Sequence, residues 1–151
     1  MSTFYSVLVF IHIFSAIMGM GPGFILNSIP KSAKTMTELR NAYAIKNRVH
    51  IFVMVGGTLL LVTGLLMGFL NPYLFGTGWY WLSLGLYLAA LAMGPFVLKP
   101  ISTPIKQMLK EHSGEEIPAQ YFLQQRKLTQ YEHVINLLFI LVIALMILKP
   151  F

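Results

Sequence analysis

Four long apolar runs dominate this sequence, and each approaches the ~20 residues that an α-helix needs to cross a bilayer. They cover residues Phe4–Leu26, Val49–Leu70, Trp79–Leu98 and Val134–Leu148. The last run is short, so we expect its helix to begin near Leu128 and to emerge into the headgroup region. Backbone polar groups in a bilayer must be satisfied within the protein, which favours helices. The sequence therefore predicts an all-α, integral membrane four-helix up-down bundle, with residues 1–151 forming one domain.

The distribution of charge supports this interpretation. Charged residues make up 11% of the chain, against roughly 25% in soluble domains. Every Lys and Arg except Lys149 lies between the first and second runs or between the third and fourth, and residues 71–78 carry no charge. The positive-inside rule then places both basic segments at the cytoplasmic face of a bacterial inner membrane and both termini outside. The net charge of +6 is explained by topology and anionic lipid, so nucleic acid is not a predicted partner.

The basic segments carry some local structure of their own. Residues 37–46 are expected to form a short amphipathic helix continuous with the second run. Pro100 and Pro104 are expected to end the third helix, because proline breaks helices. Residues 113–118 should form a turn, with His112 beside it as a solvated loop residue.

Several classes of function are excluded by missing motifs. The chain has no cysteine, which rules out disulfides, thiolate-bound metals, cysteine nucleophiles and covalently attached c-type haem. Glycine-rich phosphate loops, paired carboxylates and Ser-His-Asp sets are absent as well. Hydrolytic and phosphoryl-transfer enzymes are therefore not expected.

A short motif recurs in the two halves of the chain. Met20-Gly21-Pro22 and Met93-Gly94-Pro95 both stand near the basic end of their runs, and the next run of each half begins with a histidine, His50 or His133. This pattern predicts a tandem repeat of two helical hairpins related by an axis along the membrane normal. The alternative is a chance similarity of helix ends. If the repeat holds, the two histidines lie at the same depth.

These two histidines suggest a haem site. Ionisable residues near hydrocarbon are functional candidates, and neutral imidazole is a common axial ligand of haem iron. We expect His50 and His133 to ligate one haem b from opposite sides, with Arg48 and Arg126 binding its propionates. The alternative is that both are ordinary helix-end residues in the headgroup zone.

Small residues after His50 and a polar residue near His133 bear on this haem hypothesis. Gly57, Gly64 and Gly68 follow His50 on its own helix face, and such a bare stripe lets a flat ligand lie against the backbone. Asn136, one turn beyond His133, is polar within the membrane. It is expected either to orient His133 or to hydrogen-bond to another helix.

His12 lies in the outer half of the first run, far from the other histidines. Thr63 and Tyr87 are predicted near its depth, and Ser15 is one turn away. The simplest expectation is a core histidine hydrogen-bonded to one of these. The alternatives are a second candidate ligand for haem or metal, or a proton relay.

The sequence also resembles a known family. The resemblance rests on four stretches: Leu8–Ala16, Gly19-x-Gly21-Pro22, Arg48-x-His50 and Leu145–Pro150. Together they are similar to the DUF2269 family of small integral membrane proteins. More distantly, the chain resembles the cytochrome b561-like, CopD and HemJ-type families in its four-helix layout and in the histidine of its first helix. This resemblance implies b-type haem or metal handling. Gly85 and the loop position of His112 depart from a four-histidine, two-haem pattern, so one haem is expected.

The sequence-based hypothesis is thus a membrane protein that binds one haem b for electron transfer or for redox or haem sensing. Quinone or a redox partner protein would exchange the electrons. The rivals are a HemJ-like porphyrin oxidoreductase, a non-haem metal transporter and a structural membrane subunit. Small-residue stripes are compatible with a homodimer without requiring one.

Overall fold

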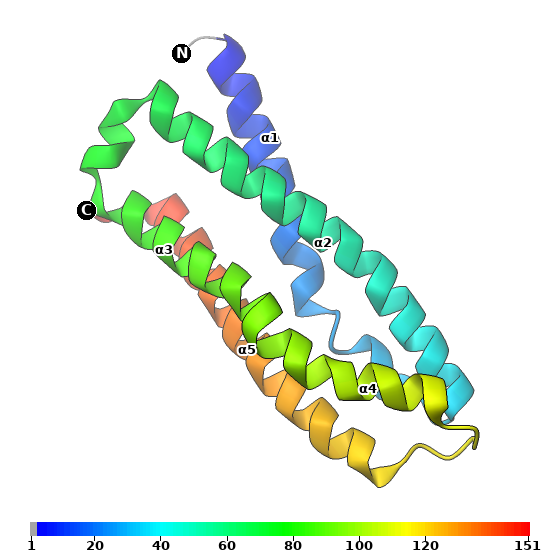
Figure 1. The fold of residues 1–151 in the computed structure, drawn as a ribbon. Helices are drawn as coiled ribbons and strands as arrows, with labels where there is room; N and C mark the ends of the chain where they lie inside the picture. Colours follow the sequence, from blue (N-terminus) through cyan, green and yellow to red (C-terminus); the bar gives the residue numbers. More distant parts are fainter. Residues whose placement is uncertain (1–2) are drawn as a thin grey trace.

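The computed structural model describes residues 3–151, and they form an all-helical bundle (Figure 1). Its four long helical segments are apolar and long enough to cross a membrane. The elements, in order, are α1 (Thr3–Met20), η1 (Gly21–Phe24), η2 (Ile29–Ser32), α2 (Met36–Leu70), η3 (Pro72–Gly76), α3 (Gly78–Met93), η4 (Gly94–Leu98), α4 (Lys99–Glu111) and α5 (Ala119–Leu148). The chain runs up and down, so both ends and η3 lie opposite the basic segments. The expected fold class is confirmed.

Two helices are much longer than the membrane requires. α2 has 35 residues, or about 52 Å at 1.5 Å per residue, against ~30 Å of hydrocarbon. Its first turns contain the expected helix over 37–46 and begin at Thr35, whose side chain accepts a hydrogen bond from Glu38 N at 3.2 Å. α5 begins at Ala119, directly after Pro118, rather than near Leu128. Both helices therefore extend past the membrane at the basic end.

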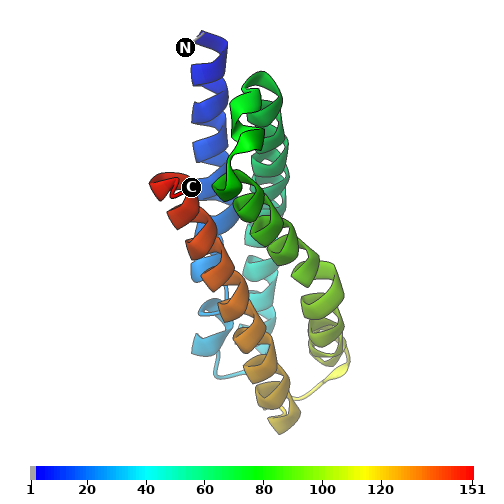
Figure 2. The ribbon, with the colours of Figure 1, turned by 90° about the vertical axis from the view of Figure 1, so that its left-hand side faces the viewer.

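The expected break at Pro100 and Pro104 is wrong. α3 ends at Met93, and the chain continues through the π-helical turn η4 into α4 without a loop. Pro100 stands in the first turn of α4, directly after the π-helical turn, in which Lys99 N–H still donates to Gly94 O. Pro104 lies inside α4. The helix bends between α3 and α4 (Figure 2), as expected where a proline and a π-helical turn coincide.

The two Met-Gly-Pro motifs occupy matching places in the fold. α1 ends at Met20 and α3 ends at Met93, and a distorted turn that contains the proline follows each. Beyond these turns the halves differ, because the four-residue η2 in the first half corresponds to the 13-residue α4 in the second. The hairpins α1–α2 and α3–α5 are thus arranged alike within the membrane and differ at the basic end.

The first hairpin is held by direct contact between helix backbones. A Cβ atom placed on Gly56 would lie 2.5 Å from Gly19 N, and one placed on Gly19 would lie 2.7 Å from Gly57 N. Close approach of this kind is how membrane helices gain packing energy, because lipid removes the hydrophobic drive between them. Ser15, which is 1% exposed, continues the same interface one turn away.

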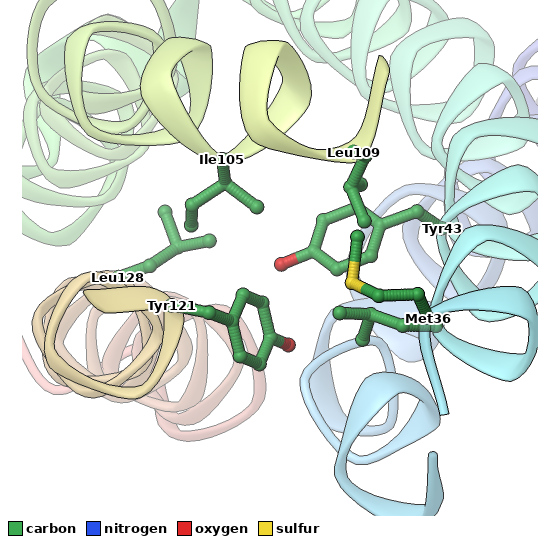
Figure 3. Packing of buried hydrophobic residues seen from close by; sticks show 7 residues of the cluster. Met36, Tyr43, Ile105, Leu109, Tyr121 and Leu128 are labelled. Atoms are coloured by element: carbon green, nitrogen blue, oxygen red, sulfur yellow. The ribbon is translucent and has the colours of Figure 1, made fainter. Parts of the chain in front are cut away.

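A second core lies at the basic end and joins the two hairpins (Figure 3). Its buried members come from α2, α4 and α5, and they are Met36, Leu39, Tyr43, Ile105, Leu109, Tyr121 and Leu128. The rings of Tyr43 and Tyr121 meet edge to face with centroids 6.4 Å apart. α4 is amphipathic: it buries Ile105 and Leu109 and leaves Lys106 and Lys110 exposed. This end is therefore packed like a small water-soluble domain.

Substitution of Gly56 by alanine should disrupt the first hairpin. The added methyl group would overlap backbone that cannot move independently, so we expect the free energy of unfolding to fall by about 2–3 kcal/mol. Gly85→Ala is the matched control, because nothing lies within 4 Å of a Cβ there. Steric trapping or reversible unfolding in detergent measures both. Equal stability of the two variants would contradict the backbone contact.

Candidate functional site

The membrane part of the bundle contains a partly open pocket of about 540 Å³ between α1, η1, α2, α3 and α5. This volume is typical of small-molecule sites, which span roughly 300–1,000 Å³. Its walls are mostly aliphatic, and the side chains that bring polar atoms to it are His12, Tyr80, Ser83 and Tyr87. An apolar pocket with few polar groups suits a largely apolar ligand whose orientation those groups determine.

His12 is fixed by a neighbouring helix. Its Nδ1 lies 2.8 Å from Thr63 Oγ1, so of the three partners expected for it the structure has Thr63. The Thr63 hydroxyl also lies 2.7 Å from Leu59 O and 3.1 Å from Leu60 O, to which it can donate its single proton. With that proton on a carbonyl, Thr63 Oγ1 accepts from Nδ1–H of His12, and the lone pair of Nε2 is left for a ligand.

Ser83 is the second polar group of interest in the pocket. It is 1% exposed, and its hydroxyl has no hydrogen-bond partner among the described residues. The two tyrosines differ, since Tyr80 donates to Gly64 O at 3.1 Å and Tyr87 donates to Gly57 O at 2.8 Å. The hydrogen-bonding capacity open to a ligand therefore lies at Ser83 Oγ and His12 Nε2.

The glycine stripe on α2 is covered by the protein itself. Tyr87 lies over Gly57, and a Cβ on Gly64 would be 3.2 Å from His12 Cε1. Tyr80 and Phe75 lie over Gly68 in the same way. Flat side chains do lie against this bare face, but they belong to neighbouring elements of the protein, and contact of Gly57 with a haem stays a prediction. What the glycines admit is the ring of His12 and the tyrosines that line the pocket.

The basic-end histidines are arranged differently from His12. His50 and His133 are both exposed, and neither makes a hydrogen bond within residues 3–151. Close to them α2 and α5 meet directly, with Lys46 Nζ 2.6 Å from Glu132 Oε1. Axial ligation by the pair stays a prediction.

The other residues predicted for that site are not brought together around a ligand. Arg48 and Arg126 are exposed on the surface of the basic end. Asn136 is buried, and its Nδ2 donates to Gly23 O at 3.1 Å. Of the two expectations for Asn136, the bond to another segment is confirmed. A Cβ on Gly23 would lie 3.1 Å from Asn136 Oδ1, so a side chain there would require this amide to shift by a few tenths of an ångström.

Sequence reasoning missed three groups in the pocket wall: Tyr80, Ser83 and Met146. One signal was available, because Tyr80, Ser83 and Tyr87 are spaced by three and four residues and so share a face of α3. That face brings polar atoms into an otherwise apolar helix. Met146 gave no such signal, since methionine is common in apolar cores.

Four membrane-spanning helices around an apolar interior pocket define a small, multi-pass integral membrane protein. Comparison with known families agrees and is more specific. Residues 6–150 match the family described as predicted integral membrane protein (DUF2269), so the chain belongs to this family. No curated protein and no solved structure matches the chain.

Replacing Thr63 by valine tests how His12 is held. Valine keeps the shape but removes the acceptor for Nδ1–H, and hydrogen bonds between membrane helices contribute about 1 kcal/mol. We expect a loss of stability of that size and a change in the ¹⁵N shifts of the His12 ring toward a mixture of tautomers. Thr58→Val is the control, because Thr58 bonds only to Met54 O on its own helix. Unchanged ring shifts in Thr63→Val would refute the assigned tautomer.

Proposed function

We propose that this protein binds one haem b in the membrane pocket, with His12 as an axial ligand, and acts in electron transfer or redox sensing. The observation that carries the proposal is the hydrogen bond from His12 Nδ1 to Thr63. Histidines that bind metals usually donate their second ring N–H to a protein acceptor, which orients the ring and raises the basicity of the coordinating nitrogen. His12 already has this arrangement, with Nε2 free at the pocket.

The residues around the pocket would supply ligands to the iron of such a group, while no Lys or Arg stands in the described lining to pair with its propionates. The aliphatic walls would exclude water, and Met20 and Met146 bring thioethers, which are soft ligands, to the lining. His/Met ligation of haem iron is known to raise its reduction potential. When bound, the haem would supply one-electron chemistry, while this chain holds it and fixes the imidazole through Thr63.

A quinone is the second candidate occupant, and Ser83 favours it. Its unpartnered hydroxyl can donate to a quinone carbonyl, while His12 Nε2 can accept from a quinol hydroxyl. The rim of the pocket also suits a lipid-soluble ligand. Ile17 of α1 and Ile147 of α5 line the pocket and are 63% and 74% exposed on the membrane-facing surface. A ligand could therefore enter from the lipid between these helices.

The visible spectrum of the purified protein tests the haem proposal. Wild type, oxidised and then reduced with dithionite, should show Soret and alpha bands. His12→Ala should lose them at unchanged protein yield, while His50→Ala and His133→Ala should retain them. Thr63→Val should keep the haem with shifted bands, because the ligand loses its orienting acceptor.

Four other outcomes would contradict the proposal, and each points elsewhere. Bands lost in both His50→Ala and His133→Ala but kept in His12→Ala would assign the haem to the basic-end pair. A protein that stays colourless with added haem but binds a ubiquinone analogue would favour the quinone. Neither ligand binding would leave the transporter and structural-subunit hypotheses. Conversion of an added porphyrinogen by the haem-loaded protein would instead show the HemJ-like reaction.

The orientation follows from the charges, and we propose that the basic end faces the cytoplasm. The exposed cations there include Lys106, Lys110, Arg48 and Arg126. Alkaline phosphatase fused after Phe151 in a bacterial host should then be active, because the C-terminus would lie outside. Fusion of the same enzyme within residues 112–118 should be inactive. The reverse pattern would overturn the orientation.

A further inference from the structure

One face of α5 is polar over its first half and apolar over its second. The polar members are spaced by four, four, three and four residues, which keeps them on one side of the helix: Tyr121, Gln125, Thr129, Glu132 and Asn136. The same face continues with Phe139, Val142 and Met146, and the last two line the pocket. The polar series therefore runs from the basic end toward the pocket.

The polar face is buried against other elements by specific contacts. Tyr43 of α2 donates to Gln125 Oε1 at 2.7 Å, and Lys46 Nζ lies 2.6 Å from Glu132 Oε1. Asn136 donates to Gly23 O, in the segment that follows α1. α2 and η1 thus cover this face of α5 and separate it from lipid.

Two polar atoms of this face, Tyr121 Oη and Glu132 Oε2, have no hydrogen-bond partner among the described residues, and Asn27 Nδ2, in the turn that follows η1, has none either. Tyr121 and Asn27 are each 3% exposed. Asn27 lies four residues after Gly23, and Glu132 lies four residues before Asn136, so the Asn136–Gly23 bond places both toward the basic end. Buried polar atoms nearly always have a partner, and internal water supplies it where protein does not.

We propose that the polar face of α5 carries a file of internal water from the basic end to the inner end of the pocket. Asn136 and the Gly23 carbonyl form its last polar step, since the next residue, Phe24, already lines the pocket. Glu132 is the ionisable group on the path that can hold and release a proton. The file would give the pocket access to protons from one side of the membrane only. It goes beyond the proposed function, because it is independent of the ligand that the pocket binds.

Cysteine accessibility tests the path directly, because the chain has no cysteine of its own. Charged methanethiosulfonate reagents react with thiolates and therefore report water contact. Asn136→Cys and Thr129→Cys place thiols on the polar face, whereas Leu137→Cys and Ile140→Cys place them toward lipid within four residues of Asn136, at positions 56% and 51% exposed. In nanodiscs we expect the first pair to react at least ten-fold faster. Equal rates in the two pairs would overturn the proposal.

A measurement on the wild-type protein guards against damage by the substitutions. Hydroxyl radicals made by X-ray radiolysis label buried rings that lie beside bound water. Tyr121 should be labelled several-fold faster than Phe139, which lies on the same face of α5 in the apolar half and is 7% exposed. Labelling of Tyr121 at the rate of Phe139 would mean a dry interface and would refute the path. Both measurements are made with and without added haem, so failure of the haem proposal does not alter their outcome.

Discussion

The contact between the backbones of α1 and α2 at Gly19 and Gly56 determines most of what the membrane half can do. These helices run antiparallel, so their register is set where they touch. Seven residues back along α1 is His12, and seven residues on along α2 is Thr63. Two helical turns separate each from the glycine contact, and the hydrogen bond between them at 2.8 Å falls in that register. A looser hairpin would leave Nδ1 unpaired in hydrocarbon and the ring without a fixed tautomer.

The second hairpin contributes the tyrosines and Ser83 of the pocket, and it is joined to the first hairpin by hydrogen bonds and by a core at the basic end. Tyr80 and Tyr87 reach from α3 to carbonyls of Gly64 and Gly57 on α2. These bonds connect the hairpins in the membrane, where apolar contact gives little drive for association. At the basic end water is available, and there the hairpins share an aliphatic and aromatic core. The protein thus uses two packing mechanisms, divided near the level of Glu132.

Some features of the fold were predictable because they depend on local chemistry. The apolar runs predicted the membrane helices, and the repeated Met-Gly-Pro motif marked the ends of α1 and α3. Pro100 and Pro104 wrongly suggested the end of the third helix. The helix continues past both prolines because the π-helical turn η4 and the bend between α3 and α4 accommodate them. The glycines of α2 suggested a surface for a ligand, whereas side chains of the protein itself lie against them. An absent side chain leaves space, but sequence alone does not say which neighbour fills it.

By itself, the sequence determined the four spans, the charge asymmetry between the two ends and the short set of histidines available to a ligand. These follow from hydrophobicity, charge and residue type, which are properties of single segments. Only the tertiary structure decided that His12 lines the pocket in the membrane part of the bundle. That choice depends on the register of α1 against α2 and on the direct contact of α2 with α5 at Lys46 and Glu132. Both are contacts between residues far apart in the chain, and the physical reason is steric, since helices settle where small residues let their backbones approach.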